Sequence, residues 1–187
     1  YDMSGVVRRI VNGGITPSDS NDQTFDIVVV GAGAAGISVC ASILERAPYV
    51  RIAVIDPADI HYYQPGWTLV GAGVFTQEET VKTMSSLIPE GVTWLKHAVA
   101  AFEPTAKRVL LDGCHTLAYD KLIVCPGLKL DWDKIEGLTQ TLGKNGVTSN
   151  YRFDLAPYTW ELVQQCKSGK ALFTQPPMPI KCAGAPQ

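Results

Sequence analysis

The stretch that decides the fold is Phe25–Val30, F-D-I-V-V-V, which is followed at once by Gly31–Gly36, G-A-G-A-A-G. A short, continuous run of β-branched residues is typical of a strand buried on both faces of a parallel sheet. Residues 35–46 fit a helix that ends near Arg46, and Val50–Ile55 fits a second strand. This order of strand, helix and strand predicts a right-handed βαβ unit.

The glycines of this unit match the pattern G-x-G-x-x-G, and Asp56 closes the second strand about twenty residues after the last glycine. The first glycine permits a tight turn, the second lets the backbone approach a pyrophosphate, and the third lets helix and strand pack closely. N–H groups at the helix N-terminus face the phosphates, and the acid accepts hydrogen bonds from ribose hydroxyls. The pattern therefore predicts a Rossmann-type dinucleotide-binding domain rather than an ordinary glycine-rich turn. The residues expected to hold the dinucleotide are Gly31, Gly33, Ala34, Ala35, Gly36 and Asp56.

Composition limits the classes of function. The chain has 187 residues, 46% of them apolar, which is enough for one domain or slightly more. Sixteen basic against eighteen acidic residues leave no excess of positive charge, so nucleic-acid binding is not expected. The five cysteines form no C-x-x-C pair and only three histidines accompany them, so we expect neither a metal site nor a disulfide scaffold. A reducing compartment is the better expectation.

Two segments raise the question of targeting. Ile27–Leu44 carries no charge and nominally reaches the length of a membrane span, but its glycines favour a strand, a turn and a helix. Residues 1–24 lack the apolar core of a secretory signal, and we expect a flexible arm that could be the end of a mitochondrial transit segment. The chain begins at Tyr1, so we expect a fragment or a processed form.

Further elements follow along the chain, and residues 128–150 turn polar, as an inter-domain connection would. The sequence predicts an aromatic and glycine-rich loop at 61–73, a short helix at 79–88, strands at Val92–Val99 and Leu122–Val124, a hairpin of Arg108–Leu111 with Thr116–Tyr119, a helix at Tyr158–Cys166 and a strand at Ala171–Thr174.

A second nucleotide site would need a second glycine loop. The predicted strand at Lys170–Thr174 runs instead into Pro176-Pro177, and proline has no N–H to offer a pyrophosphate. Cys40 is the only cysteine of the first helix, so the paired cysteines of disulfide reductases are absent there, and we expect Cys40 to pack the helix against the sheet. An electron source other than a pyridine nucleotide is therefore favoured.

Cys182 lies in the stretch K-C-A-G-A-P-Q, beside Lys181 and ahead of small residues. Such a setting suits an exposed thiolate of low pKa, which could open a sulfur–sulfur bond or add to a flavin. A free loop cysteine without a function fits the local sequence equally well.

These features together resemble the sulfide:quinone oxidoreductases of mitochondria and some bacteria. The resemblance covers residues 25–187 and rests on G-A-G-A-A-G, H-Y-Y-Q-P-G-W-T-L-V-G-A-G, V-T-W-L-K-H-A-V, G-V-T-S-N-Y and K-C-A-G-A-P-Q. It implies a noncovalent FAD held by Ala34, Ala35, Asp56, Gln64 and the backbone at Val99. The segment from Tyr119 to Gly127 is similar to T-x-x-Y-D-x-L-h-x-A-T-G of two-dinucleotide-domain flavoproteins, in which the glycine lies close to FAD. Cys125-Pro126 stands here for the usual Ala-Thr.

The resemblance also implies a reaction. Sulfide is oxidised to a persulfide on one of two redox cysteines, of which Cys182 matches one, and electrons pass through FAD to a membrane quinone. The sulfur then moves to a small thiol or sulfite, and the enzyme sits peripherally on the mitochondrial inner membrane through segments that this chain lacks. The second cysteine also belongs to a later segment.

The expected fold is therefore α/β, with an arm at 1–24, an incomplete Rossmann-type FAD domain at 25–127, and a linker with the start of a second α/β domain at 128–187. Alternatives are a flavin-dependent NADH dehydrogenase or disulfide reductase, and a truncated FAD-binding fragment without activity.

Overall fold

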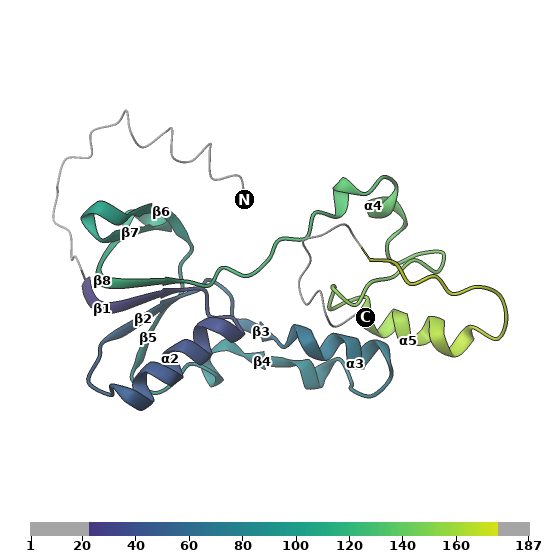
Figure 1. The fold of residues 1–187 in the computed structure, drawn as a ribbon, viewed down its shortest axis with the longest axis horizontal. Coiled ribbons are helices and arrows are strands. Elements are labelled where there is room, and N and C mark those ends of the chain that lie inside the picture. The colour runs from purple at the N-terminus through teal and green to yellow at the C-terminus, as the bar shows by residue number, and fades with distance from the viewer. Residues whose placement is uncertain (1–22, 176–187) are drawn as a thin grey trace.

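The computed structural model describes residues 23–175. Its centre is a six-stranded sheet in the order β5-β2-β1-β8-β7-β6 (Figure 1). β5, β2, β1 and β8 run parallel, whereas β7 and β6 continue the sheet in antiparallel fashion. The strands are β1 Gln23–Val30, β2 Ile52–Ile55, β5 Val92–Leu95, β6 Val99–Glu103, β7 Arg108–Leu111 and β8 Thr116–Val124.

The predicted βαβ unit is confirmed. β1 pairs in parallel with β2, so that Val30 lies opposite Ile55, and α2 (Ala34–Arg46) connects the two strands. The long uncharged stretch Ile27–Leu44 is therefore divided between a strand and a helix. Within the part of the chain that the structure describes, no helix has the length and apolar character that crossing a membrane requires.

Both faces of the parallel strands are covered, which explains why their sequences are apolar without alternation. Val28 and Val30 of β1 share one core with side chains of β2, β7 and β8, while Ile27 and Val29 share a second core with Cys40 of α2. Cys40 of α2 lies in the second core and is fully buried, as the sequence predicted. We call this part, β1, β2, β5–β8 and α2, the sheet body.

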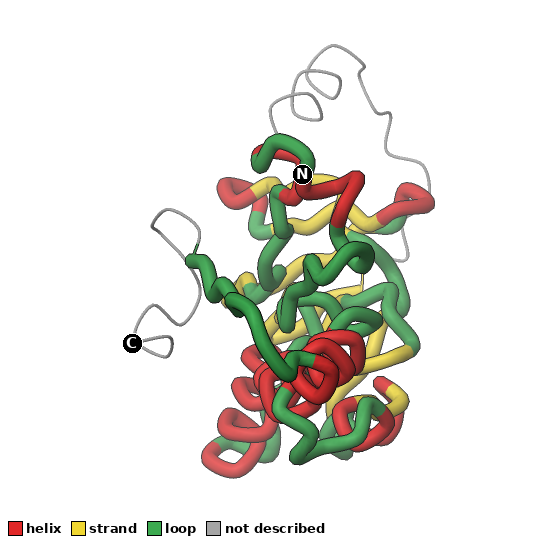
Figure 2. Tube along the Cα trace, turned by 90° about the vertical axis from the view of Figure 1, so that its right-hand side faces the viewer, coloured by secondary structure: helices red, strands yellow, loops and turns green. Residues whose placement is uncertain are grey.

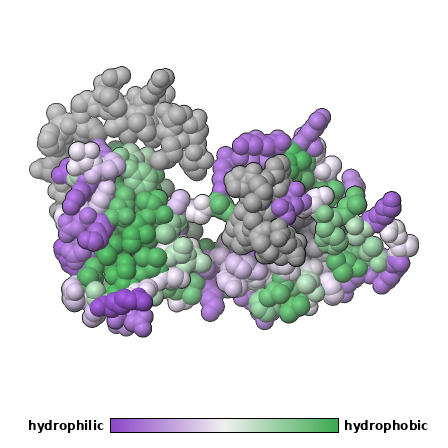
Figure 3. All heavy atoms as spheres, viewed as in Figure 1, coloured by the Kyte–Doolittle hydropathy of each residue, from purple (hydrophilic) through white to green (hydrophobic). Residues whose placement is uncertain are grey.

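One edge of the sheet body is open. β7 pairs with β8 only over Thr116–Ala118, whereas β1 accompanies β8 to Val124. Among residues 23–175, no strand pairs with the second half of β8 on that side, and Val124 is 50% exposed. Apolar side chains are exposed over the strands of the sheet body (Figure 3).

A second part of the molecule projects from the sheet body. The antiparallel pair of β3 (Ile60–Tyr62) and β4 (Val81–Thr83) leads out to α3 (Trp67–Gly71). An extended segment after β8 reaches α4 (Leu138–Thr141) and then α5 (Ala156–Gln165), which packs against α3 (Figure 1). In the turned view the larger helices, in red, lie below the strands, in yellow (Figure 2).

Four sequence predictions need correction, and tertiary pairing explains them. Residues 79–88 form no α-helix, because Val81–Thr83 pairs with Ile60–Tyr62 as β4. Only two short 3-10 turns, Glu78–Thr80 and Met84–Ser86, flank this strand. The stretch Val92–Val99 is not one strand, since the chain leaves β5 at one edge of the sheet and enters β6 at the other. The predicted loop at 61–73 contains α3.

The fourth correction concerns the predicted strand at Ala171–Thr174. Residues 171–175 are irregular and exposed, with Phe173 at 89%. A strand needs a neighbour for its N–H and C=O groups, and no strand lies beside these residues in the described part of the chain. Residues 1–22 and 176–187, with the predicted arm, Pro176-Pro177 and Cys182, lie outside the described residues.

Candidate functional site

The glycine loop lies where the carboxyl ends of β1, β2 and β8 meet. The Gly31 N–H donates to Ile55 O (2.8 Å), and the Cys125 N–H donates to Val30 O (2.7 Å). Gly31 has a φ of +94°, and a Cβ there would overlap with the carbonyl of Cys125. A Cβ at Gly36 would likewise overlap with the carbonyl of Gly31. Backbone therefore touches backbone at two successive points, and the shape of the loop depends on both glycines.

Gly33 differs from these two glycines because its surroundings are open. It precedes α2 with extended backbone, φ −69° and ψ −173°, and no side chain caps the helix. No heavy atom lies within 4 Å of a Cβ built at Gly33, and Gly33, Ala34 and Ala35 are all exposed. The first N–H groups of α2 thus face an open space at the positive end of the helix dipole. This arrangement fits the pyrophosphate of a dinucleotide.

Asp56 is anchored to the glycine loop. Its Oδ2 accepts a hydrogen bond from the Ala32 N–H (2.7 Å) and its Oδ1 accepts one from the Ala58 N–H (2.8 Å). Trp94 Nε1 donates to the Asp56 carbonyl (2.9 Å), which ties the residue to β5 as well. Each carboxylate oxygen keeps accepting capacity for a ribose hydroxyl. The sequence predicted the ribose contact, but the bond from Asp56 back to the loop appears only in the structure.

The remaining predicted cofactor residues come from three different segments. Gly127 follows β8 with a φ of +75° and is exposed, with no heavy atom within 4 Å of a Cβ built there. Val99 opens β6 opposite Leu111, and Gln64 is half-buried at the start of a 3-10 turn that leads into α3. The structure brings the glycine loop, Asp56 and the segment after β8 to one edge of the sheet. Gln64 belongs to the projecting part instead.

The cysteines of the described residues differ in how far they are buried, and so in their reactivity. Burial, with a smaller contribution from Cys125, raises the pKa of the Cys40 thiol to about 11, so this thiol is a packing group rather than a nucleophile. Cys114 and Cys166 are exposed, and Cys125 is half-buried. In residues 23–175, no three His, Cys, Asp or Glu side chains are grouped so that they could hold a metal ion.

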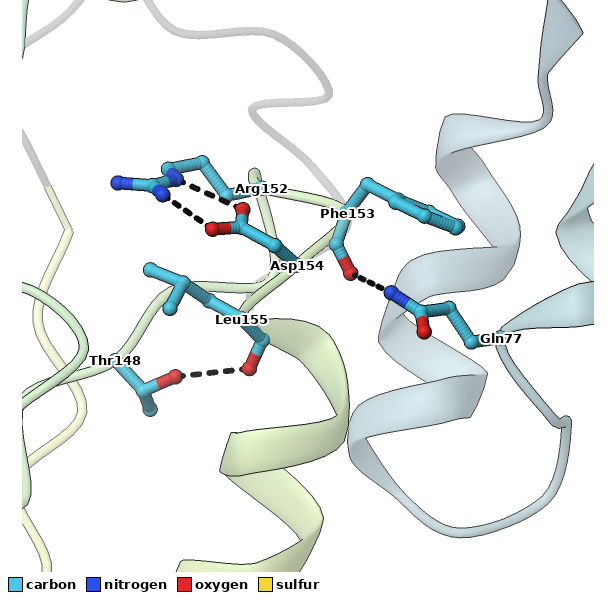
Figure 4. Close-up of polar contacts among 6 residues, drawn as sticks. All are labelled: Gln77, Thr148, Arg152, Phe153, Asp154 and Leu155. Atoms are coloured by element: carbon cyan, nitrogen blue, oxygen red, sulfur yellow. Dashed lines mark hydrogen bonds and ion pairs between the residues drawn. The ribbon is translucent and has the colours of Figure 1, made fainter. Parts of the chain in front are cut away.

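The projecting part is held together by what we call the clasp: α3 packed against residues 148–165. A Cβ at Gly73, whose φ is +72°, would overlap with the Trp160 ring, and a Cβ at Gly71 would lie 2.5 Å from Asn150 Oδ1. Gln77 Nε2 donates to the carbonyl of Phe153 (2.9 Å; Figure 4). Two glycines thus allow α3 to approach residues that lie about eighty positions later in the chain.

Aromatic rings fill the clasp. The Phe153 ring lies 4.7 Å from that of Tyr62 and 6.1 Å from that of Trp67, measured between centroids. Trp67 Nε1 and Asn150 Oδ1 are buried and have no hydrogen-bond partner among the described residues. The sequence motifs contained Trp67 and Asn150 but gave no sign that they pack in one interface.

The start of α5 is fixed by polar contacts. Thr148 Oγ1 donates to the Leu155 carbonyl (3.1 Å) and bonds to Thr159 Oγ1 (2.9 Å). The guanidinium of Arg152 donates to both carboxylate oxygens of Asp154 (Figure 4). This contact holds the pKa of Asp154 below its ordinary value. These contacts orient the segment that carries Phe153 towards α3.

The sheet, its crossover helix and the glycine loop define a Rossmann-type α/β domain of the two-dinucleotide-domain flavoproteins. The sequence profile of the pyridine nucleotide-disulphide oxidoreductases matches residues 25–174, and the chain belongs to this family of oxidoreductases.

Individual curated relatives match most of this chain. The mitochondrial sulfide:quinone oxidoreductase of Dictyostelium discoideum is 44% identical over 163 residues, which cover 86% of this chain and 36% of that protein. The enzyme of Mus musculus is 38% identical over 163 residues, covering 87% and 36%. The crystal structure of sulfide:quinone oxidoreductase from Aquifex aeolicus matches with a TM-score of 0.62 at 21% identity, covering 76% of this chain and 32% of that one, which shows a shared fold.

The resemblance predicted from the motifs is thereby confirmed, and the family and the relatives indicate a flavin cofactor. The chain spans about a third of the length of the relatives it matches.

Proposed function

We propose that this chain forms the FAD-binding part, and the start of a second domain, of a flavoenzyme that oxidises sulfide and reduces a membrane quinone. The observation that carries the proposal is the 44% and 38% identity to sulfide:quinone oxidoreductases over most of the chain. The open helix N-terminus at Gly33 supports it, because this space fits the pyrophosphate of FAD.

In this proposal the cofactor residues act through their backbone and through one carboxylate. Gly31 and Gly36 keep the loop closed, while the N–H groups around Gly33, Ala34 and Ala35 bind the pyrophosphate. Asp56 accepts from the ribose, and FAD, when bound, supplies a carrier for two electrons between sulfur and quinone. The further contacts proposed for FAD are Gln64, the backbone at Val99 and Gly127.

Cys182 is the proposed catalytic residue, in partnership with a second cysteine outside this chain. Sulfide attacks the sulfur–sulfur bridge between the two cysteines, so that this bridge breaks and a new sulfur–sulfur bond forms in a persulfide. The other cysteine leaves as a thiolate with the electron pair of the broken bond. A small thiol or sulfite then removes the outer sulfur of the persulfide.

The proposed location follows from the relatives, which are named mitochondrial. We place the full-length protein at the mitochondrial inner membrane, attached peripherally through segments outside this chain. We also propose that other segments of the full-length protein cover the open edge of β8, where Val124 is 50% exposed.

The test uses the full-length protein with FAD bound. Sulfide, added without NADH, is expected to bleach the flavin absorbance, and a quinone to restore it. Cys182→Ser should keep bound FAD and lose sulfide-driven quinone reduction, whereas Cys166→Ser, a matched change at an exposed cysteine, should keep both.

Bleaching by NADH alone would contradict the proposal and favour an NADH dehydrogenase or disulfide reductase. Residues 1–187 by themselves should turn over no sulfide, because they correspond to only about a third of the length of the related enzymes.

A further inference from the structure

A short crossing segment, residues 95–99, carries the chain from β5 at one edge of the sheet to β6 at the other. It starts directly beside Asp56, because the Leu95 carbonyl accepts the Asp56 N–H (3.1 Å). Lys96 forms an ion pair with Asp59, three residues further on from Asp56. The crossing segment therefore extends the surface that begins at the glycine loop and continues through Asp56.

Asp112, in the turn after β7, holds this segment at two successive residues. Its Oδ1 bonds to His97 Nδ1 (2.8 Å), and its N–H donates to the Ala98 carbonyl (2.9 Å). The hydrogen bond with His97 holds the pKa of Asp112 below its ordinary value, so the carboxylate is ionised and accepts. The backbone N–H of His97 also donates to the Leu95 carbonyl (2.9 Å), and this bond gives the segment a tight bend.

Hydrogen bonds thus run without interruption from the glycine loop to Asp112. The Ala32 N–H donates to Asp56, the Asp56 N–H donates to Leu95, and Leu95 accepts from His97, which in turn bonds to Asp112. The backbone at Val99 is one of the proposed FAD contacts, and the Asp56 N–H bonds to the Leu95 carbonyl. A dinucleotide with its pyrophosphate on the glycine loop and its ribose at Asp56 would therefore have its base beside residues 96–99. Backbone N–H and C=O groups of a segment that is fixed in one shape can pair with the donor and acceptor edge of a purine.

We infer that Asp112 is a positioning residue for the nucleoside half of the cofactor: through His97 it fixes the crossing segment against which the purine base binds. This inference rests on the proposed function, since it assumes a dinucleotide on the glycine loop. Asp112 itself touches no cofactor atom. It acts by holding the crossing segment in its bound shape, so that binding does not have to order it.

The test measures binding rather than turnover. Full-length protein freed of flavin is titrated with ADP, which carries the nucleoside half alone, and with FAD. Asp112→Ala should weaken both by about tenfold, because a hydrogen bond to a charged group is lost and the segment must be ordered on binding. Asp112→Asn keeps an oxygen that can accept from His97 and should stay within about threefold of wild type.

The matched control is Asp26→Ala. Asp26 also accepts from a backbone N–H and a basic side chain, both of Arg51, but at the opposite end of the parallel strands. It should leave ADP and FAD affinity unchanged. His97→Ala should weaken ADP binding as much as Asp112→Ala does, and the double variant should be no worse than either single one, since all three remove the same bond.

The outcomes separate the two proposals. If wild type binds ADP and FAD, and both Asp112→Ala and His97→Ala bind them equally well, the positioning role is wrong and the proposed function stands. If wild type binds neither compound, both proposals are wrong. Should Asp112→Ala not fold, the comparison of His97→Ala with wild type decides between the outcomes.

Discussion

The sheet body and the clasp both need glycines at close contacts, but the atoms that these glycines contact differ. In the sheet body, Gly31 and Gly36 make room for backbone carbonyls that cannot move without opening the sheet. In the clasp, Gly71 and Gly73 make room for the side chains of Asn150 and Trp160. A side chain can turn aside, whereas a carbonyl in a strand end cannot. The sheet body should therefore tolerate substitution at its glycines much less than the clasp does.

The largest effect is expected at Gly36. Gly36→Ala places a methyl group on the Gly31 carbonyl and should cost about 3 kcal/mol or more of unfolding free energy, because the helix must leave the strand. Urea unfolding followed by circular dichroism measures this change.

Gly33→Ala is the matched control at an open position, and its unfolding free energy should change by less than about 0.5 kcal/mol while FAD affinity falls. Wild-type stability in Gly36→Ala would show that the two regions do not differ as argued.

A smaller and local effect is expected in the clasp. Trp160→Ala removes a partly buried ring from its contact with Gly73 and should cost about 2 kcal/mol. Since α5 contacts α3 rather than the sheet, amide exchange should rise in residues 138–165 and stay slow in β1 and β2.

Val163→Ala, at a half-exposed position of the same helix, should leave the exchange of both regions unchanged. Equal acceleration in β1 and in α5 would mean that the clasp and the sheet body unfold as one unit.

The smallest effect concerns pH. Bonds to Arg51 lower the pKa of Asp26 in the sheet body, and the bond to Arg152 lowers that of Asp154 in the clasp, both from an ordinary value of 3.8. A carboxyl whose pKa is lower in the folded than in the unfolded state stabilises the fold above its unfolded pKa. This contribution is lost as the pH falls through the folded pKa. Stability should therefore be constant near pH 6 and decline below about pH 4.

Neutral variants assign this decline to a region. Amide exchange is measured between pH 3 and pH 6 at fixed ionic strength. In Asp26→Asn, the protection of β1 and β2 against exchange should fall less steeply with decreasing pH than in wild type. In Asp154→Asn, only the protection of α5 should change in this way. Both carboxylates are exposed, so the changes should be small and should shrink in high salt. If the loss of protection at low pH is the same in both variants as in wild type, these two carboxylates do not cause the decline.

Much of the sheet body could be predicted because its signals are local. The β-branched run before Gly31, the glycine spacing and the helix up to Arg46 all lie within one βαβ unit, and each agrees with the structure. The burial of Cys40 followed from the same unit. The predictions from sequence were wrong where a segment pairs with strands that are distant along the chain. Val81–Thr83 pairs with β3, and Val92–Val99 crosses between two edges of the sheet.

The candidate site shows the same division. Gly31, Gly33, Gly36 and Asp56 were found from spacing, and the structure places them at one edge of the sheet. The tie from Asp112 to His97 joins residues that are fifteen positions apart, with no motif between them. The contact of Gln77 with Phe153 spans seventy-six positions, and the local sequence around neither residue predicts it.

Local sequence was sufficient to predict the βαβ unit with its glycine turn, because glycine sterics and a continuous β-branched run act between neighbouring residues. The motifs likewise pointed to the family. Three contacts arise only in the folded chain: Asp56 is bonded back to the loop, Asp112 bonds to the crossing segment, and α5 packs against α3. These contacts join residues whose separation along the chain carries no periodic signal, so they exist only once the sheet has set its strands side by side.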